Sequence, residues 1–279
     1  MPKLFVPFES VGPQRVLLYG GPGAGKTDLG VSSFFDIDEE KLIRDGRLLY
    51  IGGEFNPSYK IPEANVRRFV SPVNDPHSFV DTFVSYLRKV AVDARKGQKL
   101  GAIVIDGFTE FNVLFQHTFG GDPDKDKFKK WDGLKDKIIE ALNLLDPIEL
   151  GCHVIATARV GERRKGVKSK EGDVTGADPT YMDFKYFPEM DGWARKNLPH
   201  YFNFVLYVDQ DTGTVNNKPN MPTHVLYTLG GGGDYWVKNQ YERQWIKRNL
   251  PSKLVNASFD DFLALVGKAT APIDKPAEK

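Results

Sequence analysis

The stretch Gly20-Gly21-Pro22-Gly23-Ala24-Gly25-Lys26-Thr27 fits the phosphate-binding pattern G-x-x-x-x-G-K-[ST]. It directly follows Val16-Leu17-Leu18-Tyr19, an apolar run that predicts a buried strand, and a helix can continue from Leu29. The glycines permit positive φ and a close approach of the backbone to a ligand. We therefore expect a strand, a loop and a helix N-terminus whose backbone N–H groups point at a bound phosphate.

This loop predicts a site for ATP and Mg²⁺. Lys26 is expected to reach the β- and γ-phosphates, and the Thr27 hydroxyl is expected to coordinate Mg²⁺. A glycine-rich turn that matches by chance is the alternative. The predicted nucleotide-binding residues are Gly20, Gly21, Pro22, Gly23, Ala24, Gly25, Lys26, Thr27 and Asp28.

A second apolar run, Ala102-Ile103-Val104-Ile105-Asp106, closes on a single carboxylate and resembles the Walker B element. A strand buried on both faces delivers such an acid at its carboxyl end, where open α/β sheets bind ligands. We expect Asp106 to hold the Mg²⁺ shell together with Thr27. The alternative is an ordinary aspartate that caps the following turn.

A further buried strand, Cys152-His153-Val154-Ile155-Ala156-Thr157-Ala158-Arg159, has a polar end. Strands beside a phosphate loop end near the γ-phosphate, so Thr157 and Arg159 are candidate sensors of that group. Helical periodicity separates the strands, with an apolar face from Phe79 to Ala94 and another from Trp131 to Leu145. The chain is therefore predicted to form an α/β fold with a mostly parallel central sheet flanked by helices.

The C-terminal third departs from this alternation. Residues 202–208 and 223–229 predict an antiparallel hairpin that extends the sheet. A short helix is expected from Ser258 to Val266, with Gly267 beyond its end. We expect one domain over residues 1–267 and a flexible tail over residues 268–279.

Residues 159–170 form a predicted basic surface loop, and residues 178–199 an aromatic-rich insertion. Two interpretations are open: a solvated loop beside core aromatics, or a loop that contacts the phosphates of a nucleic acid strand whose bases stack on the aromatics. The candidate DNA-binding residues are Arg163, Arg164, Lys165, Lys168 and Lys170. The candidate stacking residues are Tyr181, Phe184, Tyr186, Phe187 and Trp193.

Composition limits the function classes. The net charge is +1, so affinity for nucleic acid has to come from a local patch. The single cysteine, Cys152, excludes an internal disulfide and predicts a buried thiol in a reducing compartment. No signal peptide or membrane span is recognised, so a cytoplasmic protein is expected, in the host cytosol if the source is viral. The five histidines show no metal-ligand spacing.

The order of these parts resembles the RecA-like ATPase core, and in particular the small phage-encoded RecA-like proteins that accompany single-strand annealing and recombination. The resemblance covers roughly residues 14–255. It includes the phosphate loop, a strand ending in Gly52-Gly53-Glu54, the Asp106 strand, the Thr157 strand with its basic loop, the hairpin, and Val237-Lys238-Asn239.

This resemblance implies roles for further residues. Glu54 occupies the place of the glutamate that polarises the attacking water. Glu110 is the rival acid; it lies four residues beyond Asp106, whereas the common alternative pattern has a glutamate directly after that aspartate, where this chain has Gly107. Lys238 or Arg243 is implied to reach a neighbouring subunit's γ-phosphate, which requires a homo-oligomer. The implied partners are single-stranded DNA and a phage or host single-strand binding protein.

Two other function classes stay open. One is a motor or helicase loader with the same core, acting on duplex DNA or protein. The other is a small-molecule phosphotransferase, against which the basic loop and the absence of an acceptor-binding signature argue. A regulatory GTPase is weaker, because Asn217-Lys218-Pro219-Asn220 has Asn where a guanine-reading Asp is required.

Overall fold

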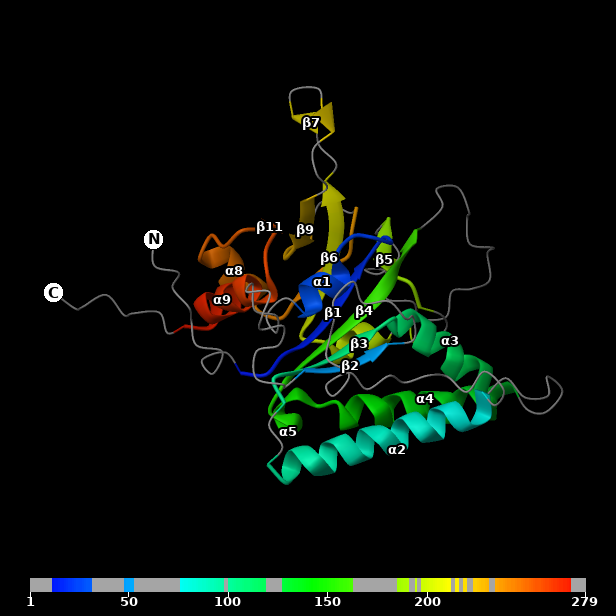
Figure 1. The fold of residues 1–279 in the computed structure, drawn as a ribbon. Coiled ribbons are helices and arrows are strands. Elements are labelled where there is room, and N and C mark those ends of the chain that lie inside the picture. The colour runs from blue at the N-terminus through cyan, green and yellow to red at the C-terminus, as the bar shows by residue number, and fades with distance from the viewer. Residues whose placement is uncertain are drawn as a thin grey trace.

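The computed structural model shows a central β-sheet between two layers of helices (Figure 1). In the described part of the chain, nine strands belong to this sheet, and β7 (Thr214–Val215) and β8 (Lys218–Pro219) form a separate two-stranded ribbon. The described residues are 12–31, 48–52, 76–97, 100–118, 127–162, 185–190, 194, 197–211, 214–215, 218–219, 223–230 and 234–271.

Five parallel strands form the middle of the sheet, in the order β6-β1-β4-β3-β2. Their apolar runs are buried on both faces, as expected for strands covered by helices on each side. The predicted mostly parallel α/β sheet is confirmed. The bounds are β1 (Arg15–Gly20), β2 (Leu48–Gly52), β3 (Ala102–Asp106), β4 (His153–Glu162) and β6 (Phe204–Asp211).

Antiparallel strands extend the sheet beyond β6. β9 (Thr223–Tyr227) pairs with the end of β6, and β11 (Lys253–Val255) pairs with β9, which confirms the predicted hairpin. β10 (Lys238–Asn239) pairs with the start of β6. β5 (Tyr186–Pro188) pairs with β4 beyond the point where β3 ends.

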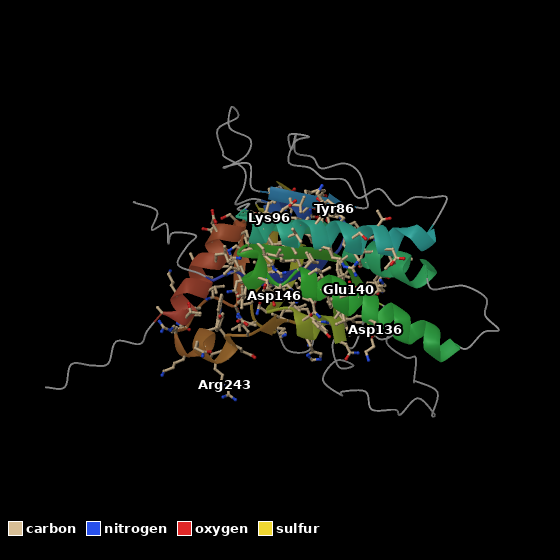
Figure 2. All side chains as sticks on the ribbon, turned by 90° about the horizontal axis from the view of Figure 1, so that it is seen from below. Tyr86, Lys96, Asp136, Glu140, Asp146 and Arg243 are labelled. Atoms are coloured by element: carbon tan, nitrogen blue, oxygen red, sulfur yellow. The ribbon has the colours of Figure 1, made fainter. Side chains whose placement is uncertain are left out.

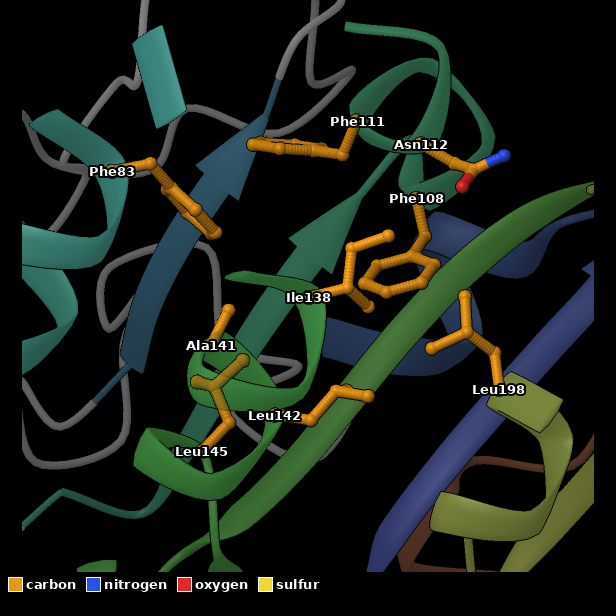
Figure 3. Close-up of a pocket in the computed structure, with 9 residues that line it drawn as sticks. All are labelled: Phe83, Phe108, Phe111, Asn112, Ile138, Ala141, Leu142, Leu145 and Leu198. Carbon is orange, nitrogen blue, oxygen red and sulfur yellow. The ribbon is translucent and has the colours of Figure 1, made fainter. Parts of the chain in front are cut away.

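One face of the sheet is covered by a layer of four helices (Figure 2). Lys137 on α4 forms an ion pair of 3.1 Å with Asp81 on α2, and the apolar sides of these two helices pack under the sheet. Figure 3 shows the side chains that line a small cavity within this layer, all apolar except Asn112. The helices are α2 (Pro76–Arg95), α3 (Phe108–Thr118), α4 (Lys127–Leu144) and α5 (Pro147–Leu150).

The other face is covered by α1 (Lys26–Val31), α8 (Glu242–Lys247) and α9 (Phe259–Thr270). A capping box at Ser258 begins α9: its hydroxyl accepts from the Asp261 N–H, and the Asp261 carboxylate accepts from the Ser258 N–H. The predicted end of this helix is wrong. Gly267 lies inside it, because the buried face continues through Val266 and Ala269, so residues 268–270 are helix and not tail.

The predicted basic loop also starts later than expected. β4 continues through Glu162, because residues 160–162 pair with β5, so residues 159–162 are strand. Tyr186, a candidate stacking residue, packs within the fold: its ring stacks on Tyr207 with centroids 5.7 Å apart. Several predicted site residues lie outside the described residues: Tyr181, Phe184, Trp193 and the basic residues Arg163, Arg164, Lys165, Lys168 and Lys170.

Two predictions about composition can be compared with the described residues. Cys152 is buried, as expected, and burial raises the pKa of its thiol to about 12. Among the described helices, none combines the length and apolar character needed to cross a bilayer.

Candidate nucleotide-binding site

The phosphate loop connects the end of β1 to α1, as predicted. Gly23 and Gly25 have φ of 72° and 86°, a conformation that glycine adopts without strain. Gly20 is required for a different reason, since a Cβ there would lie 2.0 Å from the Val208 carbonyl oxygen on β6. The Lys26 ammonium donates to the carbonyls of Gly20 at 3.0 Å and Gly21 at 2.8 Å, so it lies over the concave side of the loop.

Three hydroxyl groups converge on the Asp106 carboxylate at the end of β3. Thr27 at the start of α1 donates to Oδ2 at 3.0 Å, Tyr50 from β2 donates to the same oxygen, and Thr157 from β4 donates to Oδ1. We call these four residues the Asp106 cluster. The cluster brings the two predicted metal ligands, Thr27 and Asp106, into direct contact.

The oxygen atoms of this cluster suit Mg²⁺. Mg²⁺ prefers oxygen ligands and is usually held by one or two carboxylates together with substrate phosphates and waters. Within the ranges that the structure describes, no group of three or more His, Cys, Asp or Glu side chains could hold a metal ion. A site completed by the phosphates of a nucleotide is therefore the arrangement that Thr27 and Asp106 fit.

The strand order places Thr157 between the loop and Asp106. β4 lies between β1 and β3, with Leu18 opposite Thr157 and Ile105 opposite Ala156. The Thr157 hydroxyl accepts from the Gly107 N–H at 2.9 Å while it donates to Asp106, so it fixes the orientation of that carboxylate. In the described structure Thr157 therefore positions Asp106; its role as a γ-phosphate sensor stays a prediction.

Arg159, the other predicted sensor, forms an ion pair with Glu110. Gly107 has φ of 86°, and a Cβ there would lie 2.9 Å from Glu110 Oε2, which shows that this carboxylate folds back over the end of β3. The Arg159 N–H also donates to the Thr109 hydroxyl at 2.9 Å. The rival catalytic acid is thus close to the Asp106 cluster, in contact with a guanidinium group.

Lys238 lies at the opposite edge of the sheet from the phosphate loop. It is paired with Val205 near the start of β6, whereas Gly20 is opposite Val208. Its ammonium donates to the carbonyls of Pro199, His200 and Phe202, the first two of which belong to the 3₁₀ turn η4 (Leu198–Tyr201). Desolvation by burial lowers its pKa.

These contacts give Lys238 an intramolecular role and make it a poor candidate for a finger that reaches another subunit. Arg243, the alternative, is exposed on α8, as Figure 2 shows. Of the other predicted catalytic residues, Lys26, Asp106, Thr157 and Arg159 lie together at the carboxyl ends of the strands. Glu54 lies outside the described residues.

Sequence reasoning missed Tyr50. The tyrosine reads as one more residue of an apolar strand, and its link to Asp106 depends on the register of two strands that are distant in sequence, with Gly52 opposite Asp106. A polar-tipped aromatic two residues before the end of a predicted buried strand was the available signal, since a buried hydroxyl needs a partner.

Comparison with known proteins agrees with this geometry. A family model described as an AAA domain, AAA_24, matches residues 12–233, about four fifths of the chain, beginning just before β1 and ending beyond β9. No curated protein matches the sequence significantly. A phosphate loop, a strand-end aspartate beside the loop threonine, and the family match together carry the assignment: the chain belongs to the AAA_24 family and is an AAA-type P-loop ATPase.

Proposed function

We propose that this ATPase binds single-stranded DNA and uses ATP in annealing or recombination, like the phage-encoded RecA-like proteins that its sequence resembles. One observation carries the proposal. β4 contributes Thr157 to the Asp106 cluster and continues to Glu162, immediately before Arg163, Arg164 and Lys165. A change at the nucleotide therefore has a short covalent route to the basic residues. Basic side chains of this kind bind the phosphates of a nucleic acid strand.

The hydrolytic step assigns a role to each residue of the site. Loop N–H groups and Lys26 would stabilise charge on the phosphoryl oxygens, and Thr27 and Asp106 would hold the Mg²⁺, which would supply further positive charge at those oxygens. A carboxylate would orient the attacking water and accept its proton. We assign that carboxylate to Glu54 and assign to Glu110 the positioning of Arg159, since Glu110 is already paired with that guanidinium.

Two substitutions test this division. Glu54→Gln should leave ATP binding intact and slow hydrolysis by about a hundredfold or more, as expected for loss of a positioned base. Glu110→Gln is the matched control and should slow hydrolysis much less. Single-turnover hydrolysis measured beside equilibrium binding separates the two steps. The assignment is wrong if the large defect follows Glu110→Gln.

The proposed DNA function is tested by ATPase assays without polymer, with single-stranded DNA and with duplex DNA. Selective stimulation by single strands supports the proposal, and stimulation by duplex alone would favour the motor or loader instead. Replacing Arg163, Arg164 and Lys165 by Ala should weaken binding. It should also flatten the slope of log K against log salt by about two, at roughly 0.7 for each single-strand phosphate that the variant leaves without a cation.

The matched control removes the same charge from α8, β11 and α9. Lys247, Lys253 and Lys268 are all exposed, so replacing them by Ala should leave both affinity and salt slope unchanged. Equal decreases in the two triple variants would show that only the net charge matters.

Arg243 is the candidate for a contact across a subunit boundary. If it completes a neighbour's site, Arg243→Ala subunits mixed into wild type should depress hydrolysis below the weighted mean of the two proteins. Strictly proportional activity at every mixing ratio would argue against a shared site.

A further inference from the structure

A side chain from α3 takes part in the pairing of β4 with β5, which lies along the end of β4 (Figure 1). The register places Val160 opposite Pro188, so the next pair is Arg159 with Glu189. The Glu189 N–H donates to the Arg159 carbonyl at 2.8 Å, and such an antiparallel pair normally exchanges a second N–H···O bond. Here the second bond runs through Thr109. Its hydroxyl accepts from the Arg159 N–H at 2.9 Å and donates to the Glu189 carbonyl at 3.0 Å.

The start of α3 explains why the Thr109 hydroxyl reaches these strands. Thr109 is buried and lies in the first turn of the helix. A threonine inside a helix can bond to the carbonyl three or four residues earlier, but those residues, Ile105 and Asp106, belong to β3. A buried hydroxyl needs partners, and Thr109 has them on β4 and beside β5.

The neighbouring residue of α3 contacts the same arginine. Glu110 forms an ion pair with the Arg159 guanidinium. Two consecutive residues of α3 therefore hold one residue of β4, Thr109 at its backbone and Glu110 at its side chain. Asp106 is bonded to Thr157, two residues earlier on β4. The segment from Asp106 to Glu110 is thus connected to β4 both at the predicted metal ligand and at the predicted phosphate sensor.

The inserted hydroxyl determines where Arg159 lies. Without it, the Arg159 N–H and the Glu189 carbonyl would be left to pair with each other, because unpaired backbone groups away from water are unfavourable. Direct pairing would draw Arg159 toward β5 and away from α3. Its guanidinium would then move away from Glu110 and from the Asp106 cluster.

We propose that Thr109 is a positioning residue for ATP hydrolysis, whose hydroxyl holds Arg159 with its guanidinium beside Glu110 and the Asp106 cluster. The inference rests on hydrolysis at the phosphate loop and on the action of Arg159 near the γ-phosphate. It is independent of the proposed DNA function. Both of the bonds described above reach backbone groups, so the effect of Thr109 on the reaction passes through the residue that it holds.

The first test compares variants with and without the hydroxyl. Thr109→Val keeps the shape of the side chain and should lower kcat for ATP hydrolysis about tenfold, the rate change that corresponds to one hydrogen bond, with KM for ATP unchanged. Thr109→Ser keeps the hydroxyl and should retain the wild-type kcat. The measurement is the steady-state rate with Mg-ATP, beside urea unfolding curves that give the folded fraction.

Thr228→Val is the matched control. Thr228 is also buried, and its hydroxyl donates to the Pro251 carbonyl at 2.7 Å, just after β9. This variant should lower the stability while kcat per folded molecule stays the same. A loss of kcat in Thr109→Ser as large as in Thr109→Val would overturn the inference, because the hydroxyl would then not be the group that matters.

A double-mutant cycle with Arg159→Ala separates positioning from a general effect on the fold. If Thr109 acts through Arg159, Thr109→Val should change kcat by less than about twofold when Arg159 is already Ala. The same proportional loss in both backgrounds, or a wild-type kcat in either single variant, overturns the inference and leaves the ATPase assignment intact. If Thr109→Val fails to fold, Thr109→Ala carries the same cycle. If the wild type does not hydrolyse ATP, both the assignment and the inference fail.

Discussion

The two edges of the central sheet use polar side chains in opposite ways. At the amino edge, where the parallel strands begin, Arg15 donates to the carbonyls of Leu142, Leu145 and Tyr201 at 2.9–3.1 Å. Lys238 does the same for the turn at η4. These cations donate hydrogen bonds to carbonyls that the ends of helices and turns leave unpaired, so they stabilise the fold.

At the carboxyl edge, polar groups bond to one another. Thr27, Tyr50 and Thr157 meet on one carboxylate, and Lys26 contacts the loop that follows its own strand. Groups of these kinds can also bind phosphate oxygens and a metal ion. The difference teaches that burial of a charge is no guide to function here. Arg15, the most buried cation of those compared, stabilises the fold, whereas half-buried Lys26 is the cation predicted to bind the phosphates.

The largest effect is expected at the carboxyl edge. Asp106→Asn removes the charge that would hold Mg²⁺ and should lower the rate of ATP hydrolysis by about a thousandfold, as for loss of a main electrostatic contact. The free energy of unfolding should change little, because an amide can still accept two of the hydroxyls. The measurement pairs steady-state ATPase rates with urea denaturation. Asp211→Asn, at the carboxyl end of β6 in the same sheet, is the control.

The next effect is expected at the amino edge, at His153. Burial lowers the pKa of this histidine from 6.5 to about 4, and its Nδ1 accepts from the Gln14 N–H at 3.1 Å. Protonation of His153 is therefore less favourable in the native state than in the unfolded state. The neutral histidine makes its full contribution to the free energy of unfolding above pH 6.5, and this contribution is lost as the pH falls to 4. The contribution amounts to about 3 kcal/mol. The decrease in unfolding free energy from pH 7 to pH 4 should be about 3 kcal/mol smaller in His153→Asn than in wild type. In His200→Asn this decrease should equal that of wild type.

Lys238→Met should lower the free energy of unfolding by about 2 kcal/mol, because it leaves carbonyls of the partly buried turn at η4 without their charged donor. Hydrolysis per folded molecule should stay the same. Lys247→Met, at an exposed position on α8, should change stability by less than about 0.5 kcal/mol. The contrast between the edges would break if Lys238→Met kept full stability and lost activity, and the predicted contact between subunits would then return to Lys238.

A smaller effect is expected at Tyr50. Tyr50→Phe removes one of the two hydroxyls on Asp106 Oδ2 and should lower the affinity for Mg²⁺ in the presence of ATP by several-fold, up to about tenfold, the value of one hydrogen bond. The dependence of the ATPase rate on Mg²⁺ concentration measures this shift. An unchanged Mg²⁺ dependence would show that the loop threonine alone positions the carboxylate.

The sequence predicts those features of the molecule that depend on residues close together in the chain. Apolar runs that end in Gly20, Asp106 and Thr157-Ala158-Arg159 identify the parallel strands, and the loop motif fixes which edge carries the site. Contacts between segments that are distant in the chain cannot be predicted from such local patterns. Lys238 reads as a free cation because the carbonyls that engage it come from a turn almost forty residues earlier.

The predicted ends of α9 and β4 were wrong for the same reason. The helix that contains Gly267 runs on because its buried face continues, and β4 runs past Arg159 because β5 pairs with it. In both cases tertiary packing overrides a local signal, a glycine in one case and a run of charges in the other.

The claim on which the account depends is that the loop between β1 and α1 binds a triphosphate with the help of Lys26. Titration of Mg-ATP into wild type and Lys26→Ala, with matched unfolding curves to show that both are folded, tests it most directly. The account predicts one site per chain in the wild type and at least a hundredfold weaker binding in the variant, with stability unchanged. Equal affinity in the two proteins would contradict it.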